Sequence, residues 1–169
     1  MQLYLIRHAQ SMNNATMLLN EKEREFDPPL TPIGFEQADR LAQHIRDGYN
    51  PDGVFDRMMA GDPDARSVRG FSFTRLYCSP MYRSLLTTRP IAEVTGLQPE
   101  IWVGIHEHGG LYLDYEDERG IVSYPGRTRA EIAEEFPGYT LTDDLTDTGW
   151  WHGQREDTAA AFGRAIQVA

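Results

Sequence analysis

The sequence has little cysteine, few basic residues and no long apolar run, and each shortage excludes a class of protein. Cys78 is the only cysteine in 169 residues, which excludes an internal disulfide framework and favours a reducing compartment. The 16 Lys and Arg residues face 26 Asp and Glu residues, for a formal net charge of −10. This balance argues against nucleic acid or an anionic membrane as the main partner. No stretch approaches the about 18 apolar residues of a membrane helix, so we expect a cytoplasmic protein.

What the sequence does contain suits one globular domain. Apolar residues make up 40% and charged residues 25% of the chain, as in ordinary globular proteins. The length suits a single domain with a substantial core. Because the surface is acidic overall, any site for an anionic substrate must be a local island of basic residues.

The stretch that organises the chain is the apolar run at residues 3–6, which stops abruptly at Arg7 and His8. The run is short and apolar at every position, so it predicts a strand buried on both faces, as in an open α/β sheet. Ligands of such sheets bind just beyond the carboxyl ends of the strands. We therefore expect Arg7 and His8 to face a ligand site.

The side chains that follow this strand suit a phosphate group. The planar guanidinium of Arg7 can hold two phosphate oxygens, and His8 can act as a nucleophile or proton carrier near neutral pH. Ser11 and Asn14 can donate further hydrogen bonds to an oxyanion. On spacing alone, the alternative stays open that Arg7 and His8 merely end a strand and pair with nearby carboxylates.

A second predicted strand brings polar residues to the same edge. Residues 73–78 indicate a buried strand, followed by Ser79, Pro80 and a helix with Arg83 in its first turn. The free N–H groups of a helix amino end and a neighbouring guanidinium both favour phosphate. We expect Pro90 to kink or divide this helix.

Four sequence blocks occur in a fixed order along the chain: Arg7-His8-Ala9-Gln10-Ser11-x-x-Asn14, Leu30-Thr31-Pro32-x-Gly34, Ser79-Pro80-x-x-Arg83 and His106-Glu107-His108-Gly109-Gly110. Together they resemble the signature of the histidine phosphatase superfamily, also called the phosphoglycerate mutase-like family. Ala9 is a mild departure, because the family usually has glycine there. The resemblance implies one α/β domain over residues 1–169, a three-layer α/β/α fold with a mostly parallel central sheet. The second block is interpreted as structural, with Thr31 as the cap and Pro32 as the first residue of a helix through about Arg46.

The resemblance also implies a role for each matched residue. His8 would be the nucleophile that takes the phosphoryl group, and Glu107 would be the proton donor to the leaving oxygen. The phosphate ligands would be Arg7, Asn14 and Arg83.

Segments outside the four blocks carry further expectations. Residues 47–74 are rich in Gly and Pro and longer than an ordinary connection, so we predict an insertion loop there, with a short helix near residues 54–59. Residues 101–105 predict a third strand. The acidic residues 112–124 predict a solvated loop.

A capping box formed by Thr128 and Glu131 predicts a helix that runs to about Phe136. Arg127 and Arg129 lie at its start and are candidates, with Ser11, for holding the non-reacting part of a substrate. Surface positions without such a role explain these two arginines at least as well.

Members of the family carry a second histidine after the last helix, in a Ser/Gly-His-Gly setting at the end of a strand. Here a helix predicted at residues 156–168 is the last element, and His152-Gly153 precedes it and follows no apolar strand. We therefore expect either a C-terminally incomplete domain or a degenerate member, with weak or no activity as it stands.

The resemblance favours a phosphomonoesterase that acts on a small phosphorylated metabolite through a phosphohistidine intermediate. A mutase needs a long basic substrate cap, whereas the segment after Glu107 is acidic. A cofactor-dependent phosphoglycerate mutase-type phosphotransferase stays open, as does a non-catalytic binding or regulatory protein. We expect no cofactor, and no metal at His106 and His108, because two histidines and one glutamate do not complete a site.

Overall fold

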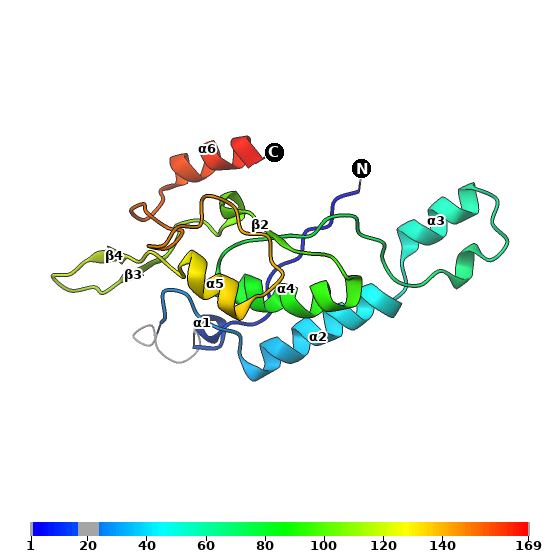
Figure 1. Ribbon diagram of the computed structural model, residues 1–169, viewed down its shortest axis with the longest axis horizontal. Coiled ribbons are helices and arrows are strands. Elements are labelled where there is room, and N and C mark those ends of the chain that lie inside the picture. Colours follow the sequence, from blue (N-terminus) through cyan, green and yellow to red (C-terminus); the bar gives the residue numbers. More distant parts are fainter. Residues whose placement is uncertain (1, 17–23, 169) are drawn as a thin grey trace.

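The computed structural model describes residues 2–16 and 24–168 and shows a mixed α/β chain arranged around two packed helices (Figure 1). These are α2 (Pro32–Asp47) and α4 (Tyr82–Thr95), which lie side by side. Two short parallel strands, β1 (Tyr77–Cys78) and β2 (Glu100–Ile101), adjoin α4. The predicted α/β class is confirmed, and within the described residues the parallel sheet consists of this one pair.

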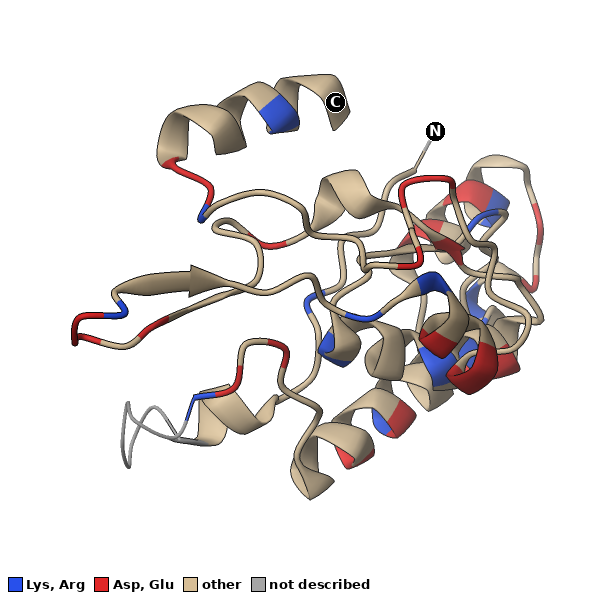
Figure 2. Ribbon diagram, turned by 60° about the vertical axis from the view of Figure 1, so that its left-hand side comes forward, with Lys and Arg blue, Asp and Glu red and all other residues tan. Residues whose placement is uncertain are grey.

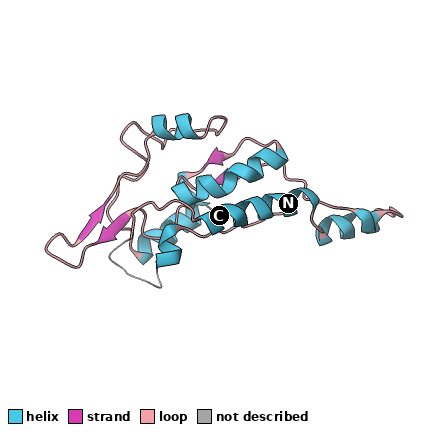
Figure 3. Cartoon of the chain, turned by 90° about the horizontal axis from the view of Figure 1, so that it is seen from below, coloured by secondary structure: helices cyan, strands magenta, loops and turns pink. Residues whose placement is uncertain are grey.

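The remaining elements extend the chain in two directions from this centre. An antiparallel hairpin and the helix α3 project at opposite ends of the molecule, as Figures 1 and 3 both show. The bounds are α1 (Met12–Thr16), α3 (Pro51–Met59), η2 (Ala65–Ser67), η3 (Val103–Ile105), β3 (Tyr112–Asp114), β4 (Ile121–Ser123), α5 (Arg129–Glu135) and α6 (Thr158–Val168).

The prediction of a buried strand at residues 3–6 is wrong. The segment belongs to no sheet of the described chain, and Leu3 and Leu5 are 75% and 89% exposed. Its main anchor is Tyr4, whose ring packs on Phe71 and Phe73 and whose hydroxyl donates to Asp52 at 3.0 Å. An apolar pattern records which side chains could be buried, whereas burial itself requires a neighbouring strand and a covering helix.

Both predicted helix starts are confirmed, because each is fixed by local hydrogen bonds. The Thr31 hydroxyl accepts from the Gly34 N–H at 2.9 Å where α2 begins. At α5, the Glu131 carboxylate accepts from the Thr128 N–H at 2.7 Å and the Thr128 hydroxyl accepts from the Glu131 N–H. Such caps satisfy N–H groups that the first helical turn leaves unpaired.

Three other local predictions are corrected. Of the predicted strand at residues 73–78 only β1 forms. Of the predicted strand at residues 101–105 only Ile101 belongs to a strand, β2, and the 3₁₀ turn η3 follows it. The predicted acidic loop is instead the β3–β4 hairpin, because its acidic residues gather at the tip while apolar residues pair in the strands (Figure 2). Pro90 does not divide its helix, because α4 continues through Pro90 to Thr95. The segment at residues 47–74 contains α3 and η2.

The main core joins α4, the β1–β2 pair, α5 and the loop before Trp150. Its members include Leu85, Ile101, Ile132, Phe136 and Trp150, all at most 3% exposed. Packing of this core fixes the carboxyl end of β1 and the first turn of α4, which carries Arg83. Within the described residues, no helix is long and apolar enough to cross a membrane.

Candidate functional site

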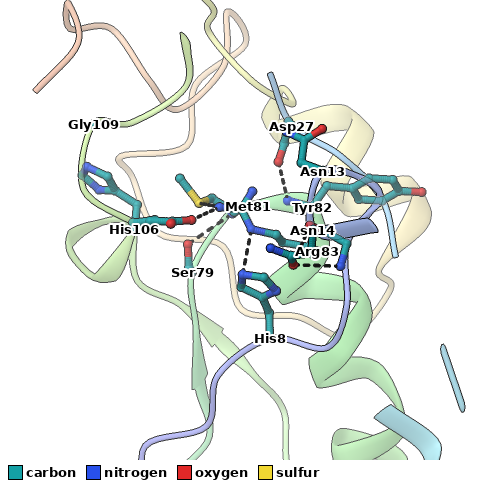
Figure 4. Close-up of polar contacts among 12 residues, drawn as sticks. His8, Asn13, Asn14, Asp27, Ser79, Met81, Tyr82, Arg83, His106 and Gly109 are labelled. Carbon is teal, nitrogen blue, oxygen red and sulfur yellow. Dashed lines mark hydrogen bonds and ion pairs between the residues drawn. The ribbon is translucent and has the colours of Figure 1, made fainter. Parts of the chain in front are cut away.

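Three residues from distant parts of the sequence meet beside the amino end of α4. The Arg83 guanidinium donates from Nε to His8 Nε2 at 3.1 Å (Figure 4). It also binds Glu107 Oε2 through Nη2. The Arg83 side chain is 9% exposed, whereas that of Glu107 is 63% exposed. The arrangement therefore places an imidazole, a buried cation and a solvent-facing carboxylate next to one another.

The hydrogen bonds of His8 define which ring nitrogen is available. Nδ1 lies 2.7 Å from the Ala9 carbonyl oxygen, which can only accept, so Nδ1 carries the proton. Nε2 then keeps its lone pair and accepts from Arg83. Burial lowers the pKa of His8, and the guanidinium groups of Arg83 and Arg7 lower it too, against the opposite effects of the Ala9 carbonyl and Glu107. A neutral imidazole whose Nε2 is unprotonated is the nucleophilic form.

The loop that carries His8 is held by the second sequence block. The Thr31 N–H donates to the Gln10 carbonyl at 3.0 Å, and the Gln10 N–H donates to the Gln37 side chain at 2.9 Å. A Cβ at Gly34 would lie 2.1 Å from the Gln10 carbonyl oxygen, so only glycine lets α2 approach this closely. On the other side, the Ala9 N–H donates to Thr87 Oγ1 of α4 at 3.1 Å.

Two N–H groups at the amino end of α4 are already paired, which leaves fewer of them for an anion than the sequence led us to expect. The Tyr82 N–H donates to Asp27 Oδ1 at 2.9 Å, and the Met81 N–H donates to Ser79 Oγ at 3.3 Å. In this structure the favourable element for an anion beside His8 is therefore the Arg83 side chain rather than the helix end.

The other residues proposed as phosphate ligands are placed less directly. Asn14 accepts through Oδ1 from the backbone N–H and the hydroxyl of Ser11, which leaves its amide NH₂ as the donor group. Ser11 is 2% exposed, so its hydroxyl supports Asn14 from inside. Arg7 is exposed and makes no hydrogen bond or ion pair with the described residues, although its charge acts on His8.

The two candidate substrate arginines have different surroundings. Arg127 lies 3.7 Å from the centre of the Tyr82 ring and pairs with Glu135 at 2.6 Å, and its charge acts on Asp27, so it adjoins the first turn of α4. Arg129 donates to the carbonyl oxygens of Leu141, Thr142 and Leu145. The guanidinium of Arg129 is thus used to hold residues 141–145 in place.

Asp27 is a site residue that sequence reasoning missed. Its Oδ2 is buried and has no hydrogen-bond partner among the described residues, while Oδ1 caps α4. Burial raises the pKa of Asp27 to about 6, against the lowering effects of the Tyr82 N–H, Arg83 and Arg127. Because 55 positions separate it from Tyr82, no local pattern in the sequence could have found this contact.

The raised pKa of Asp27 predicts a pH-dependent stability. A neutral carboxyl is favoured in the fold, so its stabilising contribution is complete below about pH 4 and is lost as the pH rises through about 6. Asn at this position keeps an acceptor for the Tyr82 N–H without the charge. At pH 7 we expect Asp27→Asn to have a free energy of unfolding about 1–3 kcal/mol larger than that of wild type, and therefore a higher urea midpoint. Near pH 4 we expect the two proteins to be equally stable.

Asp39→Asn is the matched control, because Asp39 is exposed on α2. Urea unfolding of the three proteins between about pH 4 and pH 8 measures the effect. Parallel stability curves for wild type and Asp27→Asn would contradict the raised pKa.

Among the described residues, the histidines near Glu107 do not belong to a cluster of metal-binding side chains. His106 is buried against the rings of Trp150 and Trp151, with centroid distances of 5.6 and 4.9 Å. Over residues 2–16 and 24–168, no group of three His, Cys, Asp or Glu side chains is placed to hold a metal ion. His152 contacts the Thr146 hydroxyl at 3.2 Å.

Comparison with known proteins agrees with the sequence resemblance. Residues 3–56 match the family model of the histidine phosphatase superfamily (branch 1). The fold is similar to the crystal structure of the ecdysone phosphate phosphatase, EPPase, from Bombix mori in complex with tungstate, with a TM-score of 0.52 and 16% sequence identity. The alignment covers 95% of this chain and 63% of that chain, so this chain spans less than two thirds of that protein. No curated protein matches the sequence.

Proposed function

We propose that this chain is a histidine phosphatase that hydrolyses phosphate monoesters through a phosphohistidine formed on His8, since residues 3–56 match the family model. One observation carries the proposal: Arg83 contacts both His8 Nε2 and the Glu107 carboxylate. An imidazole, a guanidinium and a carboxylate are thereby brought to one place, and they suit the roles of nucleophile, phosphate ligand and proton donor. The substrate class is a small phosphorylated metabolite.

The first step transfers the phosphoryl group to His8. An entering phosphate would draw the N–H groups of Arg83 to its oxygens, which frees the Nε2 lone pair that Arg83 now occupies. Nε2 then attacks phosphorus in line, the N–P bond forms and the P–O bond to the leaving group breaks. Glu107, protonated at this stage, gives its proton to the departing oxygen. Arg83 stabilises the charge on the phosphoryl oxygens.

The second step returns the enzyme to its starting state. Glu107, now a carboxylate, takes a proton from water as the water oxygen attacks phosphorus. The N–P bond breaks, His8 recovers its lone pair on Nε2 and inorganic phosphate leaves. Glu107 suits both roles because most of its side chain faces solvent, where water and a leaving group can reach it.

The segment that follows Glu107 favours hydrolysis over transfer to a second metabolite. Glu116, Asp117 and Glu118 lie exposed at the tip of the β3–β4 hairpin, and Asp117 neutralises Arg119 through contacts of 2.7 to 3.1 Å. A mutase needs a basic cap that holds an anionic sugar acid between two phosphoryl transfers, and this acidic tip does not supply one. The Bombix mori protein with the similar fold is a phosphatase, which supports the same choice.

Replacement of Glu107 by glutamine tests the role of the proton donor. We expect hydrolysis of an alkyl phosphate to fall by about 10²- to 10⁴-fold, because an alkoxide leaves poorly without a proton. Hydrolysis of a nitrophenyl phosphate should fall much less in the first step, because nitrophenolate leaves without protonation. Burst-phase kinetics with both substrates measure the difference.

Glu118→Gln on the hairpin tip serves as the control, and we expect it to retain wild-type rates with both substrates. Equal losses of the burst rate with the two substrates in Glu107→Gln would contradict the assignment of Glu107 as the proton donor.

A further inference from the structure

The loop that carries Glu107 is held from outside by two residues near the C-terminal helix. We propose that Arg164 and Glu156 are positioning residues that fix the Glu107 loop, residues 104–109, relative to Arg83. The proposal rests on the proposed function, since it assigns these residues to the placement of the proton donor. Neither residue touches His8 or Arg83 in the described structure, so their effect must act through the backbone of this loop.

Arg164 of α6 binds the loop before Glu107. Its Nη1 donates to the carbonyl oxygens of Gly104 at 2.7 Å and His106 at 3.1 Å. The five N–H donors of a guanidinium lie in one rigid plane, so two carbonyl acceptors on the same nitrogen fix the direction of the chain between them. Glu107 follows the second of these carbonyls directly.

Glu156 binds the loop after Glu107. The Glu156 N–H donates to the Gly109 carbonyl at 3.2 Å, and Glu156 Oε2 accepts from the Gly109 N–H at 3.4 Å. Gly109 adopts a φ of +98°, a conformation that favours glycine. The turn is closed by the Gly110 N–H, which donates to the Glu107 carbonyl at 3.2 Å.

The two holding residues form one unit. Arg164 Nε and Nη2 donate to the two oxygens of the Glu156 carboxylate at 2.8 and 2.6 Å, a bidentate pair. The Glu156 side chain is 6% exposed, and the pairing with Arg164 is the main reason that the pKa of Glu156 lies below its usual value. The backbone on both sides of Glu107 is therefore attached to one buried ion pair.

Apart from Arg164, α6 supports the loop by packing on η3, where Val168 lies against Gly104. No residue of α6 is buried, and Phe162 and Ile166 are 69% and 79% exposed. Arg164 is thus the principal polar connection between α6 and the catalytic loop among the described residues. Glu107 itself is free to reach Arg83, because its side chain takes part in none of these contacts.

Arg164→Gln tests the proposal. We expect kcat for an alkyl phosphate to fall by about 10- to 100-fold with KM within about twofold, since displacement of a catalytic group by about 1 Å can cost 10²-fold. The loss with a nitrophenyl phosphate should be smaller. Arg164→Lys should recover part of the activity. Arg155→Gln is the control, because Arg155 contacts only the Tyr112 ring in the described structure.

Amide hydrogen exchange gives a readout that does not depend on activity. In Arg164→Gln the amides of Gly109 and Gly110 should exchange at least about tenfold faster, while those of Leu85 and Leu86 in α4 stay unchanged. Because Arg164→Gln leaves the Glu156 charge buried, the double variant Glu156→Gln/Arg164→Gln repeats the measurement without that charge.

The outcomes separate this proposal from the proposed function. Faster exchange at Gly109 and Gly110 with no phosphatase activity in wild type would support the loop attachment and contradict the proposed function. Exchange and kinetics equal to those of Arg155→Gln would overturn the positioning role, as would a uniform increase of exchange over the whole chain.

Discussion

Replacement of His8 by asparagine will reduce hydrolysis of an aryl phosphate to the uncatalysed rate, a loss of at least about 10³-fold. The reason is that His8 Nε2 is the atom to which phosphorus must bond, and an amide nitrogen has no comparable lone pair. Asparagine is close to histidine in size and can keep a hydrogen bond to the Ala9 carbonyl. Steady-state rates of purified wild type and variant, with unfolding midpoints to show that the fold persists, measure the effect.

His152→Asn is the matched control for this experiment. His152 is an exposed histidine that contacts Thr146, and we expect its replacement to leave the rate unchanged. If His8→Asn and His152→Asn both retain the wild-type rate, His8 is not the nucleophile.

Replacement of Arg83 by methionine will lower kcat/KM by about 10³-fold or more, the size expected when an arginine that stabilises phosphoryl charge is lost. Methionine fills much of the space of the buried arginine stem but carries no charge. Arg83→Lys keeps the charge and loses the planar fork that spans His8 and Glu107, so we expect it to recover only a small part of the rate.

Arg83→Met should also change the pKa of His8, which can be measured without substrate. The Arg83 guanidinium lowers the pKa of His8, so the imidazole of Arg83→Met should titrate at higher pH than that of wild type. NMR titration of the His8 ring measures the shift, with Arg89→Met as the control, because Arg89 pairs with Glu135 at 3.7 Å. A His8 pKa that is unchanged or lower in Arg83→Met would show that the two groups are not in contact.

Local signals in the sequence were sufficient for two helix caps, whereas the candidate site residues came from the order of the sequence blocks. Thr31 and Thr128 cap their helices through contacts within three residues, so their role is readable from neighbouring letters. His8, Arg83 and Glu107 come from three separate blocks whose order along the chain carries the family resemblance, and the structure brings them into contact.

Features that depend on distant neighbours could not be predicted in this way. Residues 3–6 have the composition of a buried strand, but no element of the described chain covers them. The contact between Asp27 and Tyr82 and the contacts of Arg164 with the Glu107 loop span 55 and about 60 positions. The β3–β4 hairpin was missed because its acidic turn masks two short strands with apolar residues at Leu113 and Val122.

The most direct test of the account is a search for a phosphoryl group on His8. The protein is mixed with a ³²P-labelled aryl phosphate, denatured rapidly in alkali and digested, and the labelled peptide is identified by mass spectrometry. The account predicts an acid-labile, alkali-stable label on the peptide that contains His8, and no label in His8→Asn. Phosphate release without any label on His8, or equal labelling of His8→Asn, would contradict it.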